Sequence, residues 1–544
     1  MTMTNLKLSR RSLLGGFGVA GLVGASSLAA CSQGGSGGPE PTNPSTGIAL
    51  PSYIRFEGGE PDIAGTEAGI PDVYFSYPAN PQAVSSEVPS DGSPITVSVP
   101  SVSPVPPTMD RNAFWQGLNE RLGTDLTVSI TPAADWSDRF ATAVAGDNLG
   151  DLFNVDGSFA RLPQFLETQC QDLTEYLAGD AIADYPFLAN IPTDSWRGCV
   201  FNGGIYGIPV PRGVLSTLVA YTRNDLFAAR GVDPGWTSMD ELLQTSQEMT
   251  DERSNTWALA AVPLQILQQM VGLPNTWQLE GGAFTHIVEL EEYKEALEFG
   301  RRLLEAGVVH PDSVGSADSD RKTWFDQGSA AVLQGTYSAM GQLYRESAAG
   351  PGFDVGIVTT PGPDGDPAQV WLGNPNNSIS AMRRAEPERV RMLLSVLNWL
   401  AAPFGTEEHL FRKFGEQGVH HERGGSDPVL NDRGISETAL GLQYLVEGPL
   451  PLHYPDLPEV AQRVHDHMTA AVPDGMLDPT LGLYSAKQSE LGSQLNTIIT
   501  DASNSVLLGR EPISSWDDVL QNWRTRGGDE VAAEYEAALE ARDG

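Results

Sequence analysis

The residues best placed to hold a ligand follow a short apolar strand near the middle of the chain. Ile205–Ile208 is predicted to be that strand, and the loop Pro209–Ser216 follows it. Pro209 and Pro211 fix their own φ angles and restrict the residues before them, so the loop is stiff before anything binds. The loop carries Arg212, whose guanidinium offers several hydrogen-bond donors. The alternative is that the loop only joins two strands of an ordinary α/β domain.

The histidines and acidic residues form no recognisable catalytic or metal-binding motif. His465 and His467 would point to different sides of a helix, and the adjacent His420 and His421 also diverge. The sequence contains no HExxH motif and no P-loop. Among 70 acidic residues, no carboxylate pair for glycoside hydrolysis is singled out. We therefore expect no catalytic residue, no metal and no cofactor.

The chain is acidic and long enough for two folded lobes. Its 544 residues include 40% hydrophobic and 19% charged side chains, which are values typical of globular proteins. The formal net charge of −37 would repel both nucleic acid and an anionic membrane surface. We interpret the acidic surface as a feature that favours solubility, and nucleic acid is not expected as a partner.

Residues 1–30 are predicted to be an export signal. A basic run with Arg10 and Arg11 precedes the apolar stretch Leu13–Ala30, which is the pattern of a signal peptide. The motif Ser9–Gly15 (SRRSLLG) resembles a twin-arginine signal, with leucine where phenylalanine is often found. The mature chain is therefore expected outside the cytoplasm.

Cys31 is the expected point of attachment to the membrane. Leu28–Cys31 (LAAC) resembles a lipobox, which implies a lipid such as palmitate on the Cys31 sulfur; the alternative is an incidental thiol in a discarded segment. Residues 31–47 are rich in Gly, Ser, Pro and Asn and are predicted to be a flexible tether. We expect the lipid to hold the protein at the outer face of the cell membrane.

Two further cysteines, Cys170 and Cys199, remain after export. In an oxidising compartment they could form a disulfide that closes a modest loop. Two buried free thiols are the alternative, and the sequence leaves both possibilities open.

The mature chain is predicted to start with an extended segment and to continue with α/β units. Residues 48–93 combine many Pro and Gly residues with several aromatics, so we expect them to lie on the folded body. Ile95–Val99 and Leu126–Ile130 are predicted strands on either side of a helix, Asn112–Leu122. Asp151–Val155 is a third predicted strand. This βαβ pattern predicts a parallel sheet.

Several segments resemble the extracellular solute-binding proteins of ABC importers, in the branch that carries oligosaccharides. The central match is GGIYGIP (Gly203–Pro209) followed by a loop, an apolar strand and YTRNDLFAARG (Tyr221–Gly231). The other matching segments are Trp136–Phe153, Tyr185–Trp196, Gly328–Val332, Phe414–His421 and Gly509–Tyr535. Ser329, Gln417 and His421 depart from the usual residues of the family.

The resemblance implies an α/β, two-lobe periplasmic-binding-protein-like fold with a hinge and a ligand cleft between the lobes. The chain would cross between the lobes after the central loop and again near Trp371–Ser380. We expect residues 94–221 and 371–425 to form lobe 1. Lobe 2 would comprise 222–370 and 426–544, including the C-terminal helices.

The implied ligand is an oligosaccharide that is captured outside the cell and delivered to the permease subunits of an ABC transporter. Neutral sugars present hydroxyls and apolar ring faces, so their sites combine Trp or Tyr platforms with planar hydrogen-bonding side chains. The candidate ligand-binding residues on the segments expected at the cleft are Trp136, Arg212, Trp257, Trp277, Tyr337, Trp371, Asn374, Glu416 and His420. For each aromatic residue alone, packing in the core is the alternative.

Two other functions stay open at the level of sequence. One is a secreted polysaccharide-active enzyme with a carboxylate pair, and the other is a binding protein for a peptide or another solute. Binding without turnover would exclude the enzyme, and a cleft without aromatic platforms would favour another solute. The solute-binding interpretation predicts a monomer that is not an enzyme.

Overall fold

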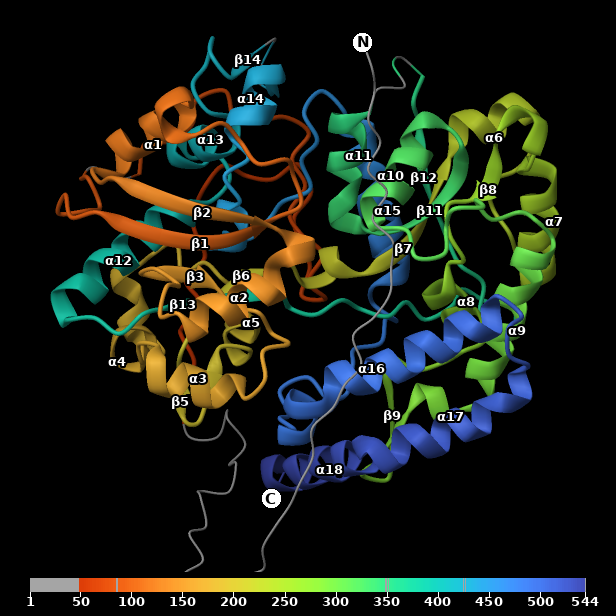
Figure 1. The fold of residues 1–544 in the computed structure, drawn as a ribbon. Helices are drawn as coiled ribbons and strands as arrows, with labels where there is room; N and C mark the ends of the chain where they lie inside the picture. Colours follow the sequence, from red (N-terminus) through yellow and green to blue (C-terminus); the bar gives the residue numbers. More distant parts are fainter. Residues whose placement is uncertain are drawn as a thin grey trace, which may run out of the picture. The chain divides into compact units, whose positions relative to one another are not determined.

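The computed structural model of the protein describes residues 48–84, 87–347, 350, 352–423, 425 and 427–543. The expected export signal, Cys31 and the expected tether lie outside these ranges. Two separate mixed sheets, each covered by helices, organise the described residues (Figure 1). Within the described residues, no helix is both long and apolar enough to span a membrane.

The first sheet has five strands in the order β2-β1-β3-β13-β6. β1 pairs in parallel with β2 and β3, which confirms the predicted βαβ unit, whereas β13 is antiparallel to β3 and β6. Alternate residues of β1 point to the two faces of the sheet, and the apolar ones are buried. The strands are β1 (Ile95–Ser101), β2 (Leu126–Pro132), β3 (Leu152–Asn154), β6 (Ile208–Pro211) and β13 (Asn376–Met382).

The second sheet has four strands in the order β12-β7-β11-β8. β7 is antiparallel to both β12 and β11, and β8 is parallel to β11. These strands are β7 (Leu218–Arg223), β8 (Trp257–Leu259), β11 (Ala330–Thr336) and β12 (Val355–Val358). The remaining strands form antiparallel pairs: β4 (Val200–Phe201) with β5 (Gly204–Ile205), β9 (Trp277–Glu280) with β10 (Ala283–His286), and β14 (His421–Arg423) with β15 (Pro428–Leu430).

The helices begin and end where the sequence provides caps. α1 starts after Asn112, whose side chain accepts a hydrogen bond from the Trp115 amide, and ends at Gly123 in the left-handed conformation. The first-lobe helices are α1 (Ala113–Leu122), α2 (Trp136–Ala145), α3 (Leu162–Gln169), α4 (Thr174–Leu177), α5 (Thr193–Arg197), α12 (Pro387–Leu400), α13 (Glu407–Phe414) and α14 (Asp432–Glu437).

The second lobe contains the remaining helices. Figure 1 shows the C-terminal helices α16, α17 and α18 beside one another, and their residues share buried clusters with β9, β10 and α9. The second-lobe helices are α6 (Asn224–Arg230), α7 (Met239–Met249), α8 (Leu264–Met270), α9 (Glu291–Glu305), α10 (Asp318–Gln327), α11 (Met340–Glu346), α15 (Pro458–Ala471), α16 (Ala486–Leu507), α17 (Trp516–Trp523) and α18 (Asp529–Asp543).

The chain passes between the two sheets at segments that the buried cores define. It leaves the first sheet after β6 through the short 3-10 helix η4 (Gly213–Ser216) and returns between β12 and β13. Val446 belongs to the first-lobe core and Leu452 to a second-lobe core, so a further passage lies between them. By core membership, the first lobe therefore extends past residue 425, and β7 belongs to the second lobe.

An extended segment lies on the folded body ahead of β1. Residues 48–84 contain no helix and no strand of the sheets. The amide of Ile54 donates to the Ala189 carbonyl at 2.8 Å, and the amide of Tyr74 donates to the Leu452 carbonyl at 3.0 Å. The segment is thus hydrogen-bonded to both the first-lobe and the second-lobe cores.

Cys170 and Cys199 are free, buried thiols. They pack in different hydrophobic clusters, and burial raises the pKa of both thiols. Of the two alternatives left open by the sequence, the structure contains the unpaired one.

Candidate functional site

The C-terminal ends of three strands of the first sheet lie on the same side of that sheet. β1 and β3 are parallel, and β6 runs the same way because both β3 and β6 are antiparallel to β13. The strands end at Ser101, Asn154 and Pro211. We call this the first-sheet carboxyl edge. Ligands of open α/β sheets bind at such an edge, where the connections on either side of one strand diverge.

Asn154 fixes a distant segment to this edge. Its side chain is 3% exposed, and Nδ2 donates to Ser378 Oγ at 2.8 Å and to the Tyr444 carbonyl at 2.7 Å. Ser380 Oγ also donates to that carbonyl, at 3.2 Å. The Tyr444 ring is partly buried, and burial raises the pKa of its phenol, while the Arg212 charge opposes that shift. The phenol therefore stays protonated at neutral pH.

Arg212 and Asn374 are brought together where the chain crosses between the lobes. The amides of Arg212 and Gly213 both donate to the Pro375 carbonyl at 2.9 Å. The Gly373 amide donates to Thr217 Oγ1 at 3.0 Å. The Asn374 side chain is exposed, and the Arg212 side chain is partly exposed. These bonds hold two candidate residues on adjacent crossing segments.

The second lobe contributes hydroxyls close to the same crossing. Thr336 is the last residue of β11 and pairs with Leu218, the first residue of β7 after the crossing. Its Oγ1 lies 2.8 Å from Ser338 Oγ, and Ser338 is exposed. Hydroxyls of the second lobe are therefore near this crossing.

A charge cluster lies within electrostatic reach of Arg212. Glu447 Oε1 accepts from Arg412 Nη1 at 2.8 Å, and Oε2 accepts from Lys413 Nζ at 2.6 Å. Burial by itself would raise the pKa of Glu447, but Arg412, Lys413 and Arg212 outweigh it and hold this pKa at about 2. Burial lowers the pKa of Lys413 to about 8, although Glu447 opposes the shift. We call Arg412, Lys413 and Glu447 the Glu447 cluster.

Three aromatic candidates are enclosed by protein. Trp136 begins α2, is 8% exposed and packs on Phe140; its indole Nε1 has no partner among the described residues. Trp371 is buried, and its Nε1 donates to the Leu273 carbonyl at 2.9 Å. Tyr337 is fully buried, with its hydroxyl 2.6 Å from His467 Nδ1.

Two further tryptophans pack against aromatic neighbours within the second lobe. Trp257 begins β8, at the end of that strand opposite to the hinge, with its ring centroid 4.7 Å from that of His310. Trp277 is 4% exposed and packs against Tyr535 and Trp523 of the C-terminal helices. The structure does not bring these two rings to Arg212.

Glu416 and His420 lie in the loop between α13 and β14. Glu416 forms an exposed ion pair with Arg121 at 2.9 Å. His420 is 1% exposed, and its Nε2 lies 3.1 Å from Glu437 Oε2. Both side chains are therefore engaged with other first-lobe residues.

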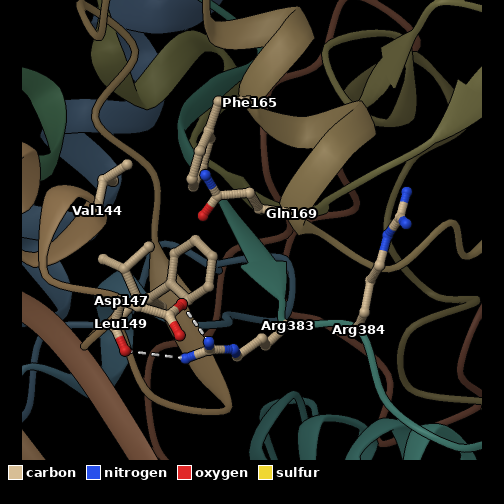
Figure 2. A pocket seen from close by; sticks show the side chains of 8 residues that line it. Val144, Asp147, Leu149, Phe165, Gln169, Arg383 and Arg384 are labelled. Carbon is tan, nitrogen blue, oxygen red and sulfur yellow. Dashed lines mark hydrogen bonds and ion pairs between the residues drawn. The ribbon is translucent and has the colours of Figure 1, made fainter.

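Two pockets occur among the described residues, and Arg212 lines neither of them. The first, of about 410 Å³, lies at the opposite edge of the first sheet, where β13 ends and β3 begins. Figure 2 shows Arg383 bonded there to Asp147, with Arg384 pointing elsewhere. The second, of about 710 Å³, is lined by Trp257 and other second-lobe residues. Neither pocket contains a residue of the first-sheet carboxyl edge.

The sequence singled out Arg212 and Asn374 as candidates but not the groups from distant parts of the chain described above. Asn154 and Tyr444 are 290 residues apart in sequence, so no local pattern connects them. Lys413 and Glu447 belong to a helix and a loop whose sequences resemble ordinary structural segments. Asn154 alone had a signal, because it is a polar residue at the end of a buried strand.

Taken together, the two α/β lobes and the crossing segments define a two-lobe, periplasmic-binding-protein-like fold. Residues 106–386 match the family described as bacterial extracellular solute-binding protein. This chain belongs to that family, which confirms the fold and the relationship expected from its sequence. Membership of the family indicates an extracytoplasmic protein that binds a solute.

The chain is similar to two curated proteins and, in fold, to solved structures of binding proteins. The chain is 22% identical over 451 residues to the polygalacturonan/rhamnogalacturonan-binding protein YtcQ of Bacillus subtilis (strain 168), which covers 78% of this chain and 87% of YtcQ. It is also 22% identical over 469 residues to lipoprotein LipO of the same organism, covering 80% of this chain and 90% of LipO. The crystal structure of the alginate-binding protein AlgQ2 without calcium ion aligns with a TM-score of 0.64 at 14% identity, covering 84% of this chain and 99% of AlgQ2.

Among the described residues, no group of three or more His, Cys, Asp or Glu side chains is arranged to hold a metal ion.

Proposed function

We propose that this protein captures an extracellular oligosaccharide in a cleft beside the first-sheet carboxyl edge and delivers it to a membrane ABC permease. The observation that carries the proposal is the placement of Arg212 and Asn374 on adjacent crossing segments, with Tyr444 within reach of the Arg212 charge. An amide, a phenol and a guanidinium together offer donors and acceptors for several sugar hydroxyls. In this proposal Trp136, Tyr337 and Trp371 stabilise the lobes and do not contact the sugar, because their side chains are buried.

Capture would be coupled to movement of the lobes. Arg212 follows the last first-sheet strand before the crossing, and Thr336 is at the corresponding edge of the second sheet. A ligand that contacts both stabilises the conformation in which both contacts exist, and the permease can recognise that conformation. The short crossing segments are the hinge of this proposal.

The protein is proposed to work as a lipid-anchored monomer. Cys31 would carry the lipid, and residues 32–47 would hold the folded lobes away from the membrane. The similarity to a lipoprotein supports this anchoring. A Cys31→Ser change should release the protein from the membrane fraction into the medium; continued membrane retention would contradict the proposed anchor.

The proposal assigns no catalysis to this chain. Glu447 is the carboxylate whose charge interacts with Arg212, and its pKa of about 2 keeps it ionised at neutral pH. An ionised carboxylate that already accepts from Arg412 and Lys413 cannot protonate a leaving group. Turnover of a bound sugar would contradict this part of the proposal.

A thermal-shift screen of the purified protein tests capture directly. Oligosaccharides of varied linkage would be compared with peptides at equal concentration. A ligand at a hundred times its dissociation constant stabilises the folded state by about 2.7 kcal/mol, which raises the melting temperature measurably. Stabilisation by one class of glycan supports the proposal, whereas stabilisation by peptides alone contradicts it.

A further inference from the structure

We infer that the captured glycan carries carboxylate groups, as in a uronic-acid oligosaccharide, and that Arg212 binds one of them. This inference rests on the proposed function and specifies the chemistry of its ligand. The supporting observation is an excess of positive charge formed by Arg212 and the Glu447 cluster.

The excess follows from the partners within the Glu447 cluster. Both Glu447 oxygens accept from charged donors, Oε1 from Arg412 and Oε2 from Lys413. The Arg412 and Glu447 side chains are 3% and 2% exposed, so this pair is shielded from water. One carboxylate thus faces two cations before Arg212 is considered.

Arg212 adds a third positive charge without adding an anion. Its charge acts on Glu447, Lys413 and Tyr444, so it lies within electrostatic reach of all three. Among the described residues it forms no ion pair, and the hydrogen bond of its guanidinium is a 3.2 Å contact with the Pro211 carbonyl. Its other donors are left for a partner from outside the chain.

Arg223 serves as a comparison, because its guanidinium binds several groups of the protein. Arg223 at the end of β7 is 3% exposed and binds both oxygens of Asp225, at 2.9 and 2.7 Å. Its Nη1 also donates to the carbonyls of Phe325 and Asp326. All three nitrogens of the Arg223 guanidinium therefore donate to protein acceptors, whereas the Arg212 guanidinium donates to the Pro211 carbonyl.

A planar carboxylate is the partner that best completes such a guanidinium. It can accept two parallel hydrogen bonds from Arg212 and bring the missing negative charge. A neutral sugar hydroxyl supplies an acceptor but leaves the charge uncompensated. The remaining hydroxyls of the sugar would bind Asn374 and Tyr444.

The charge of the whole chain makes a local cationic site necessary for such a ligand. At −37, the protein as a whole repels anions at long range. The net positive group beside the hinge reverses that repulsion locally. An anionic glycan would therefore be attracted only where the proposed cleft opens.

The test compares matched glycans by titration calorimetry on the full chain. The probes are oligomers of galacturonate, mannuronate and glucuronate, and the same oligomers with their carboxyl groups converted to methyl esters. Esterification removes the charge and keeps the sugar rings and hydroxyls. We expect one acid series to bind at least tenfold more tightly than its esters and to weaken as salt is added.

Substitutions at Arg212 assign the contact. Arg212→Gln should weaken binding of the acid by on the order of 10- to 100-fold and weaken binding of its ester far less. Arg212→Lys, which keeps the charge but not the planar fork, should fall between the two. The matched control is Arg301→Gln, which makes the same change in net charge at an exposed pair with Glu305 on α9.

The outcomes separate the inference from the proposed function. Equal binding of acids and esters, or tight binding of neutral oligosaccharides only, overturns the inference and leaves oligosaccharide capture standing. An equal loss for acid and ester in Arg212→Gln shows that Arg212 only shapes the site, and it also overturns the assignment. Binding of peptides with no binding of any glycan contradicts both proposals.

Discussion

Arg412 and Glu447 form a buried ion pair that ties helix α13 to the segment by which the chain leaves the first lobe. Their atoms Nη1 and Oε1 are 2.8 Å apart, and Arg412 Nη2 also donates to the Val446 carbonyl at 2.6 Å. One side chain thus binds both the carboxylate and the backbone beside it. The pair fixes the starting point of a passage between the lobes, next to Arg212.

Replacing Arg412 should destabilise the protein strongly. Arg412→Leu leaves Glu447 buried with Lys413 as its one remaining hydrogen-bonded cation, and it removes the Arg412 donor from the Leu442 and Val446 carbonyls. Removing one partner of a buried pair costs about 3–5 kcal/mol. Urea unfolding should show a loss of this order.

The control for Arg412→Leu is Arg301→Leu, which breaks the exposed pair with Glu305 within α9. Exposed pairs of this kind contribute about 0.3–0.5 kcal/mol. Similar losses in the two variants would show that the buried pair is not special.

Acid should weaken the fold partly through Glu447. Its folded pKa of about 2 lies below the usual value of 4.5, so the unfolded state takes up a proton first as the pH falls. The stability that Glu447 contributes is present above pH 4.5 and is lost as the pH falls toward 2. The melting temperature should therefore drop less between pH 5 and 3 in Glu447→Gln than in the unchanged protein. An identical drop in both would contradict the assignment.

Base should weaken binding of an acidic glycan through Lys413. Burial holds the pKa of this side chain at about 8, and Arg412 and Arg212 add to the shift while Glu447 opposes it. A bound carboxylate favours the charged form of Lys413, so binding is linked to its protonation. Affinity for the acid should fall between pH 7 and 9, with proton uptake detectable in buffers of different ionisation enthalpy. Affinity for the methyl ester should stay level.

The sequence was sufficient to predict the framework of the first sheet. Ile95–Val99 alternates apolar and polar residues, and Asn112 and Gly123 bracket a helix, so local rules place β1 and α1 correctly. The strand expected over Ile205–Ile208 is displaced: β5 ends at Ile205, and β6 begins at Ile208 and runs through Pro211 into the expected loop before η4 begins. β6 pairs with the antiparallel strand β13, and this tertiary pairing, not the local apolar stretch, sets where the strand lies.

The site was harder to predict because its neighbours come from distant parts of the chain. Arg212 stood out through the prolines beside it, whereas Tyr444 is held in place through hydrogen bonds from Asn154 and Ser380 to its carbonyl. Aromatic residues gave the least reliable signal. Trp257 and Trp277 occur in loop-rich sequence, yet the structure has both rings packed against other aromatic side chains.

Substitution of two tyrosines should distinguish a residue that stabilises the fold from a residue that binds the ligand. Tyr337→Phe removes the hydroxyl that lies 2.6 Å from His467 Nδ1, so it should cost about 1–3 kcal/mol of stability with little change in glycan affinity. Tyr444→Phe should do the reverse, since its phenol lies within reach of the Arg212 charge at the proposed site. Chemical unfolding and titration of each variant measure the two effects. Loss of affinity in Tyr337→Phe alone would reverse the two roles.

Gly373 should control how closely the crossing segments approach. A Cβ at this position would lie 2.4 Å from the carbonyl carbon and from Cβ of Ser216, and 2.8 Å from its Cα. Backbone atoms cannot move aside without separating the segments, so Gly373→Ala should break the bond from the Gly373 amide to Thr217 Oγ1. Because that bond joins the two crossings, we expect altered lobe closure and weaker glycan binding as well as lower stability. Small-angle scattering with and without glycan would measure closure, and Gly59→Ala, whose Cβ meets nothing within 4 Å, is the control. Unchanged closure and affinity in Gly373→Ala would show that the hinge lies elsewhere.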